Sequence, residues 1–166
     1  MPFATIEQPG VTRQKWLTLA AVLGLAHWCF GNLYEAVVFS PNWVQDSPLQ
    51  LTRLNGFFVR TGPTLYFVPL TMLATVGVWV LLWRNRQPGP RRDYRRASVF
   101  AAWATAVNLL IVTTIVPKMF GADFLAHAEE LNRYCWAWNV LNAVRIALVA
   151  ATTCCVFNAF RKLDRL

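Results

Sequence analysis

Hydrophobic residues are concentrated in four long stretches that are separated by shorter, more polar segments. The stretches cover residues 16–39, 61–83, 97–116 and 134–160. A helix needs about 20 mostly apolar residues to cross the hydrocarbon layer of a bilayer, and each stretch is long enough. Backbone amides in lipid must be satisfied within the protein, so these stretches are predicted to be helices. We therefore predict an all-α, integral membrane, antiparallel four-helix bundle, with residues 1–166 forming a single transmembrane domain.

Short interfacial helices are expected in the connections that follow the first and third spans. In the first of these, Ser47 can cap a helix and Pro48 can occupy its first turn. Apolar residues then recur at helical spacing, at Leu51, Leu54 and Phe58. In the other connection Asp123 is a candidate cap. Together these helices could cover one mouth of the bundle.

Charge reinforces the membrane assignment and orients the chain. Only 14% of the residues are charged and 56% are hydrophobic, whereas an ordinary soluble domain is roughly 25% charged. The net charge of +8 is uneven, because most basic residues flank the chain ends and the link between the second and third spans. These are Arg13, Lys15, Arg84, Arg86, Arg91, Arg92, Arg95, Arg96, Arg161, Lys162 and Arg165. The positive-inside rule then places both termini in the cytoplasm, and we expect a bacterial inner membrane. Anionic headgroups explain this charge better than nucleic acid does.

Polar residues on the fourth span form a narrow stripe. At 100° per residue, Trp138, Asn142, Arg145 and Thr152 lie on one helix face. A charged residue inside a membrane span costs roughly 2.5–3.5 kcal/mol on insertion scales, so it normally faces protein. The stripe therefore predicts that the fourth span turns a polar face toward the bundle interior.

The first span carries a second polar face. Gly24, His27, Trp28, Gly31 and Glu35 share this face, with Asn32 at its margin. We expect Glu35 or His27, together with Asn142, to satisfy Arg145, because an unpaired buried guanidinium would be costly.

These faces predict a polar pocket between the first and fourth spans. The candidate catalytic residues are His27, Glu35 and Arg145, and the candidate substrate-binding residues are Trp28, Asn32, Tyr66, Asn108, Trp138 and Asn142. Polar side chains and small residues also hold transmembrane helices together without any further role. That alternative stays open for Asn108 in particular.

No metal or cofactor is predicted. The nearest approach to a ligand set is His127 with Glu129 and Glu130, a spacing that is common on solvated helices. The four cysteines include no C-x-x-C pair, and a disulfide between Cys29 and Cys135 is conceivable.

Three features resemble the small four-helix membrane family described as anthrone-oxygenase-like. They are "GNLYEAVVFSPNW" at residues 31–43, a long third span that ends at Pro117, and "WNVLNAVRIAL" at residues 138–148. The resemblance implies the four-helix fold and oxidation of an anthrone to an anthraquinone without metal or flavin. Under it His27 or Glu35 would be the base, Arg145 and Asn142 would stabilise an enolate, and tryptophans would clamp the rings.

Two functions are therefore compatible with the sequence. The first is a membrane-embedded enzyme acting on a lipophilic aromatic, polyketide or isoprenoid-like substrate that enters from the bilayer. The alternative is a non-catalytic accessory subunit, which would bind a membrane protein partner or a second copy of the chain. A transporter ranks last, because neither inverted repeats nor broken helices are evident.

Overall fold

The chain is helical nearly throughout in the computed structural model. It describes the backbone of residues 9–165 and the side chains in this range except those of Pro9, Thr64 and Leu65. The elements in chain order are α1 (Pro9–Tyr34), the π-helix η1 (Glu35–Phe39), α2 (Ser40–Val44), α3 (Ser47–Phe57), α4 (Pro63–Arg84), α5 (Pro88–Leu110), the π-helix η2 (Ile111–Ile115), α6 (Val116–Phe120), the 3₁₀ helix η3 (Phe124–His127) and α7 (Leu131–Leu163).

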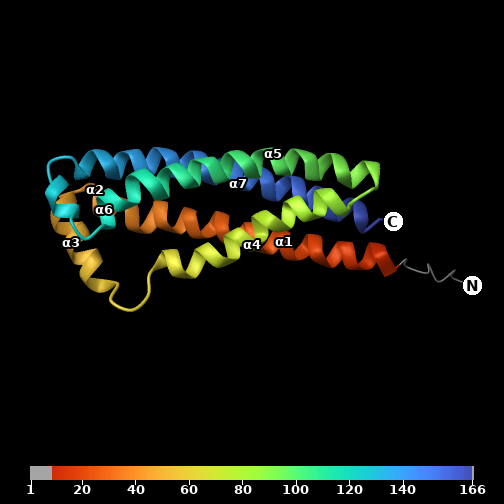
Figure 1. Cartoon of the computed structure of the whole chain (residues 1–166), viewed down its shortest axis with the longest axis horizontal. Coiled ribbons are helices and arrows are strands. Elements are labelled where there is room, and N and C mark those ends of the chain that lie inside the picture. The colour runs from red at the N-terminus through yellow and green to blue at the C-terminus, as the bar shows by residue number, and fades with distance from the viewer. Residues whose placement is uncertain (1–8, 166) are drawn as a thin grey trace, which may run out of the picture.

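Four helical segments are long and apolar enough to cross a membrane. They are Gly10–Val44, Tyr66–Arg84, Pro88–Phe120 and Leu131–Leu163. Successive segments run in opposite directions, so α2, α3, α6 and η3 gather at one end of the bundle, here called the outer end (Figure 1). The described part of the chain contains no strand, which confirms the predicted all-α bundle with short helices in the outer connections.

The spans are longer than the apolar stretches that predicted them. The first begins at Pro9, the third at Pro88 and the fourth at Leu131, each several residues before its predicted start. Apolar composition registers only the part of a helix that lies in hydrocarbon, whereas these helices continue into the polar interface. Pro88 occupies the first turn of α5, where its fixed φ is compatible with a helix.

The outer caps differ from their predicted form. Asp46 precedes α3 with a left-handed backbone (φ 49°), and the Ser47 hydroxyl donates to the Val44 carbonyl at 3.3 Å instead of capping α3. Asp123 stands at the start of η3 but makes no capping hydrogen bond through its side chain. The predicted helices are present, but the predicted side-chain caps are not.

Two proline residues explain why π-helices interrupt the first and third spans. Pro41 and Pro117 lie just after η1 and η2, and each lacks the N–H that would continue the α-helical ladder. In both places an i→i+5 bond closes the turn instead, from Ser40 N–H to the Glu35 carbonyl and from Val116 N–H to that of Ile111. Each of these turns contains one residue more than an α-helical turn, which widens the helix locally.

The bundle core is divided into an inner and an outer part. The inner cluster joins all four spans through small and branched side chains such as Ala21, Ala74, Ala97 and Val149. The outer cluster is built from η1–α3, η2–α6 and α7, and none of the described α4 side chains belongs to it. Toward the outer end α4 diverges from α5 and α6 (Figure 1). That divergence leaves space for a pocket.

Candidate functional site

Arg145 is buried in the bundle, with only 6% of its surface exposed. Its Nε and Nη2 donate to Asn142 Oδ1 at 3.2 and 2.7 Å, and its Nη1 donates to Asn108 Oδ1 at 2.6 Å. A guanidinium carries five N–H donors, so these bonds use three of them. The other two have no partner in the described part of the chain, and Arg145 lines the pocket. Arg145 is therefore fixed in position but can still donate to a ligand.

Asn142 connects this group to the first span. Its side chain is fully buried, and its Nδ2 donates to the backbone carbonyl of Asn32 at 3.2 Å. The Asn32 side chain in turn donates to the Trp28 carbonyl at 2.8 Å. The Asn142 amide thus orients the Arg145 guanidinium and joins α7 to α1. Asn108 joins the same guanidinium to α5. The predicted partner Asn142 is confirmed.

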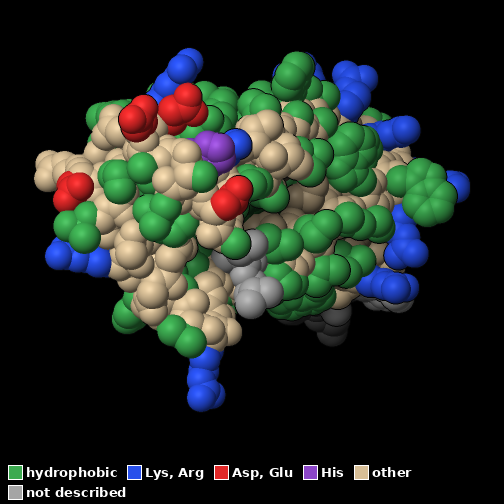
Figure 2. Space-filling model, turned by 60° about the vertical axis from the view of Figure 1, so that its left-hand side comes forward, with side chains coloured by type: hydrophobic (Ala, Val, Ile, Leu, Met, Phe, Trp, Pro, Cys, Tyr) green, Lys and Arg blue, Asp and Glu red, His purple; other side chains and the backbone are tan. Residues whose placement is uncertain are grey.

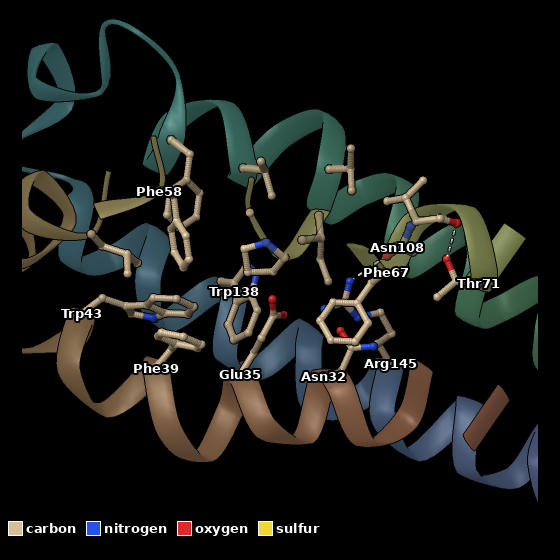
Figure 3. Close-up of a pocket in the computed structure, with 18 of the residues that line it drawn as sticks. Asn32, Glu35, Phe39, Trp43, Phe58, Phe67, Thr71, Asn108, Trp138 and Arg145 are labelled. Carbon is tan, nitrogen blue, oxygen red and sulfur yellow. Dashed lines mark hydrogen bonds between the residues drawn. The ribbon is translucent and has the colours of Figure 1, made fainter. Parts of the chain in front are cut away.

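Glu35 provides the only acidic side chain among the residues that line the pocket in the described structure. It belongs to η1, and its carboxylate extends from that turn into the space between the helices (Figure 3). Glu35 and Arg145 attract each other through space, yet no direct ion pair joins them. The expectation that Glu35 or His27 satisfies Arg145 directly is therefore wrong; Asn108 takes that place. Both side chains therefore remain available to a ligand in the pocket.

Aromatic rings form a large part of the wall of this pocket, which has a volume of about 280 Å³. Trp43 packs edge-on against Trp138 with ring centroids 4.9 Å apart, and Phe39 stacks parallel to Trp43 at 6.3 Å. Phe58, at the end of α3, meets the edge of Phe39 at 6.2 Å. Flat walls of this kind favour a flat, apolar ligand.

Two further donors in the pocket lining lack partners. Trp43 Nε1 and Asn55 Nδ2 are both buried and make no hydrogen bond within the described structure. Buried polar atoms are normally satisfied, so an unpaired donor beside a cavity indicates a missing partner. With the free Arg145 donors they give the site a surplus of donors over acceptors. The complementary ligand carries oxygen acceptors on a largely apolar skeleton.

Two exposed residues of neighbouring spans are among those that line the pocket. Val68 of α4 is 38% exposed, and Val112 of η2, in the third span, is 42% exposed. Both side chains lie within membrane-crossing segments, where an exposed surface contacts lipid. Figure 2 shows hydrophobic side chains over one flank of the bundle, acidic and histidine side chains at the outer end, and Lys and Arg side chains both at the opposite end and at the outer end.

Several predicted site residues lie elsewhere. His27 and Tyr66 do not line the pocket; their rings contact each other at 5.2 Å where α1 meets α4, and Tyr66 is 65% exposed. The pocket is not confined to the first and fourth spans, because all four spans and α3 line it. Of the predicted residues, the structure brings together Trp28, Asn32, Glu35, Asn108, Trp138, Asn142 and Arg145.

The sequence analysis did not include Phe39, Asn55, Phe58 and Phe67 among the site residues, although all four line the pocket. Asn55 and Phe58 come from the outer connection that was expected to cover the mouth. A helical wheel drawn for α1 at 100° per residue cannot place Phe39, because η1 changes the angular step.

No metal site is formed in residues 9–165. No group of three or more His, Cys, Asp or Glu side chains in the described structure is arranged to hold a metal ion. The His127 ring is 2.9 Å from Lys118 Nζ, and Glu130 accepts a hydrogen bond from the Tyr134 hydroxyl at 2.8 Å. All four cysteines are described and free, so Cys29 and Cys135 are not joined.

Comparison of the chain with protein-family models, curated proteins and solved structures gives no match.

Proposed function

We propose that this protein is a membrane-embedded enzyme that oxidises a lipophilic, oxygen-bearing aromatic compound with dioxygen. The observation that carries the proposal is the pairing of Glu35 with Arg145 across an aromatic pocket. The Glu35 carboxylate and two N–H groups of Arg145 have no hydrogen-bond partner within the described residues. Both side chains line the same cavity, and no direct bond joins them. A purely structural pair would be expected to bond directly, because separating buried charges is unfavourable.

The residues suit a substrate in which a carbonyl activates a neighbouring C–H bond, as in an anthrone. Glu35 accepts the proton from carbon, and the enolate oxygen that forms is held by the two free N–H groups of Arg145. Dioxygen adds to the carbanion, and the peroxide takes the proton back. Loss of the second C–H proton breaks the O–O bond and releases water. The net change converts CH₂ and O₂ into C=O and H₂O.

Substrate access supports the same class of compound. Entry past the exposed lining residues Val68 and Val112, between α4 and the third span, would let an apolar molecule reach the pocket from the hydrocarbon layer without crossing water. We infer that the basic end of the bundle is cytoplasmic, with both termini there, and that the membrane is a bacterial inner membrane. The pocket would then lie in the outer half of the bilayer.

The direct test is turnover of a hydroxylated anthrone by the purified protein in phosphatidylcholine vesicles. Quinone absorbance and oxygen uptake would be recorded, and protein-free vesicles would measure spontaneous oxidation. We expect Glu35→Gln to lower the rate by about 10²-fold or more. Arg145→Met should cost about 10²–10³-fold. Equal quinone formation with and without protein would refute the proposal.

Two control variants test whether a lower rate comes from loss of the pocket residues or merely from a change in the charge of the protein. Glu129→Gln and Arg133→Met change exposed residues near the outer end that do not line the pocket, and both should retain turnover. Quenching of tryptophan fluorescence by the quinone measures binding independently. Quinone binding that depends on Arg145, without any turnover, would instead favour the non-catalytic accessory subunit.

A further inference from the structure

A second pocket lies between α1 and α4, at the end of the bundle opposite the outer helices. Its volume is about 270 Å³. It is lined by Gly10, Arg13, Gln14 and Leu17 of α1 and by Gly77, Val80, Leu81 and Arg84 of α4. It shares no lining residue with the aromatic pocket, and the proposed oxidation does not use it.

Two arginines stand at this pocket without acidic partners. Arg13 and Arg84 are exposed, and neither forms an ion pair within the described residues. Other cations at the same end do form pairs: Lys15 lies 2.5 Å from Asp164, and Lys162 lies 2.6 Å from Asp93. Unlike these lysines, the two arginines present unpaired positive charge from adjacent helices to one cavity.

A third polar residue, Gln14, lies beside the two arginines. The Gln14 amide, which also approaches the Tyr94 hydroxyl, lines the pocket. Its buried Nε2 has no partner of normal hydrogen-bond geometry in residues 9–165. The two guanidinium groups are suited to the oxygens of a phosphate, which accept several charge-assisted hydrogen bonds.

The rest of the pocket is apolar and leads toward the membrane interior. Leu17 and Val80 are partly exposed, at 43% and 37%, and form its sides. Gly77 keeps it open, since a Cβ atom added there would meet nothing closer than the Ala21 Cβ at 4.0 Å. A groove with a cationic end and an apolar body matches the shape of a lipid better than that of a free anion.

Tryptophans mark the depth of this groove. Trp16 and Trp83 are adjacent in sequence to its lining and are 61% and 83% exposed. Exposed tryptophans at helix ends lie at the level of the lipid headgroups. Arg13 and Arg84 therefore lie where a phosphodiester would be, and Leu17 and Val80 lie where acyl chains begin.

We propose that this groove is a binding site for one anionic phospholipid. Arg13 and Arg84 hold the headgroup phosphate, and an acyl chain lies along Leu17, Gly77 and Val80. Basic pockets between transmembrane helices bind acidic lipids in this way, with about 1 kcal/mol for each basic residue near the surface, which is roughly five-fold in affinity.

The experiment is native mass spectrometry of the full-length protein in neutral detergent. Phosphatidylglycerol, phosphatidylcholine with the same chains, and inorganic phosphate would be added separately. We expect one phosphatidylglycerol to be retained in preference to phosphatidylcholine, and inorganic phosphate not to displace it. The double variant Arg13→Gln/Arg84→Gln should bind roughly 25-fold more weakly, from five-fold per arginine. The control Arg91→Gln/Arg92→Gln, which removes two exposed charges outside the groove, should bind normally.

A separate variant tests the apolar part. Gly77→Leu fills the groove and leaves both arginines in place, so it should also lose the lipid; Leu17→Gln gives the same test if Gly77→Leu does not fold. The proposal would be overturned if both double variants lost phosphatidylglycerol equally, or if the protein retained phosphatidylglycerol and phosphatidylcholine equally. Displacement of phosphatidylglycerol by inorganic phosphate would also overturn it. None of these results depends on turnover in the aromatic pocket.

Discussion

Nη1 of Arg145 on α7 donates to Oδ1 of Asn108 on α5 at 2.6 Å, across the interface between two membrane-crossing helices. Asn108 therefore joins α5 to α7, and it also lines the pocket in which it orients the Arg145 cation. Asn108 and Asn142 together accept from three of the five guanidinium N–H groups, and none of these bonds involves Glu35.

Replacement of Asn108 tests this role. Asn108→Ala removes the acceptor and leaves one charged N–H group unsatisfied, so we expect unfolding in detergent to become easier by about 1.5–3 kcal/mol. Thr113→Val is the matched control, since Thr113 is exposed on the same span and bonds only to the Leu109 carbonyl of its own helix. Thermal unfolding followed by circular dichroism gives both values. Equal destabilisation would mean that the Asn108–Arg145 bond contributes nothing specific.

The sequence was sufficient to predict the four spans and the inward direction of Arg145. Both follow from the cost of placing polar groups in hydrocarbon, which depends on residue type and helical spacing alone. Asn142 was identified for the same reason, because it shares a helix face with Arg145.

The pairing of partners was less predictable, because it depends on helix rotation and depth. Spacing on α1 put His27 on the same face as Glu35, but the close approach of α4 at Gly31 places His27 against Tyr66 and Phe67. The π-turns also change the angular position of every residue beyond them. Neither effect is visible in a regular helical wheel.

Gly31 is predicted to set the position of one pocket wall. A Cβ atom at Gly31 would collide with Phe67 Cε1, so Gly31→Ala must displace that ring. We expect a loss of about 1–3 kcal/mol in the free energy of unfolding, which is typical of overpacking. Quinone binding, measured by tryptophan fluorescence, should weaken as well.

Gly77→Ala is the control for the change in helix propensity that any Gly→Ala substitution brings. The added Cβ makes only an ordinary contact at 4.0 Å, so the higher helix propensity of alanine should stabilise the protein by up to about 1 kcal/mol. If both substitutions changed the free energy of unfolding by similar amounts, helix propensity and not contact with Phe67 would explain the effect of Gly31→Ala.

The proposed entry between α4 and the third span can be blocked without altering any polar group. Val112→Trp places a large ring there, and we expect turnover of a lipophilic anthrone to fall by about ten-fold or more, which corresponds to an entry barrier raised by ~1.4 kcal/mol. Val99→Trp, at an exposed position of α5 outside the pocket, should leave the rate unchanged. A rate unaffected by Val112→Trp would indicate entry by another route, such as the outer end beneath α3.

Pro117 should control the pocket through the π-turn that precedes it. In Pro117→Ala the new N–H can bond to the Thr113 carbonyl, so the helix no longer needs the i→i+5 closure at Ile111. Proline in a helix interior costs about 3 kcal/mol, and the variant should recover part of this and unfold at a higher temperature. However, conversion of the π-turn to an α-helical turn rotates Val112, Val116 and Phe120 relative to Asn108, so quinone binding and turnover should both fall.

Pro69→Ala separates the effect on stability from the effect on the pocket, because Pro69 lies inside the regular helix α4 and does not line the pocket. It should gain stability and keep binding. If Pro117→Ala also kept full binding, the π-turn would not shape the site, and the pocket geometry would have to arise from α3 and η1 alone.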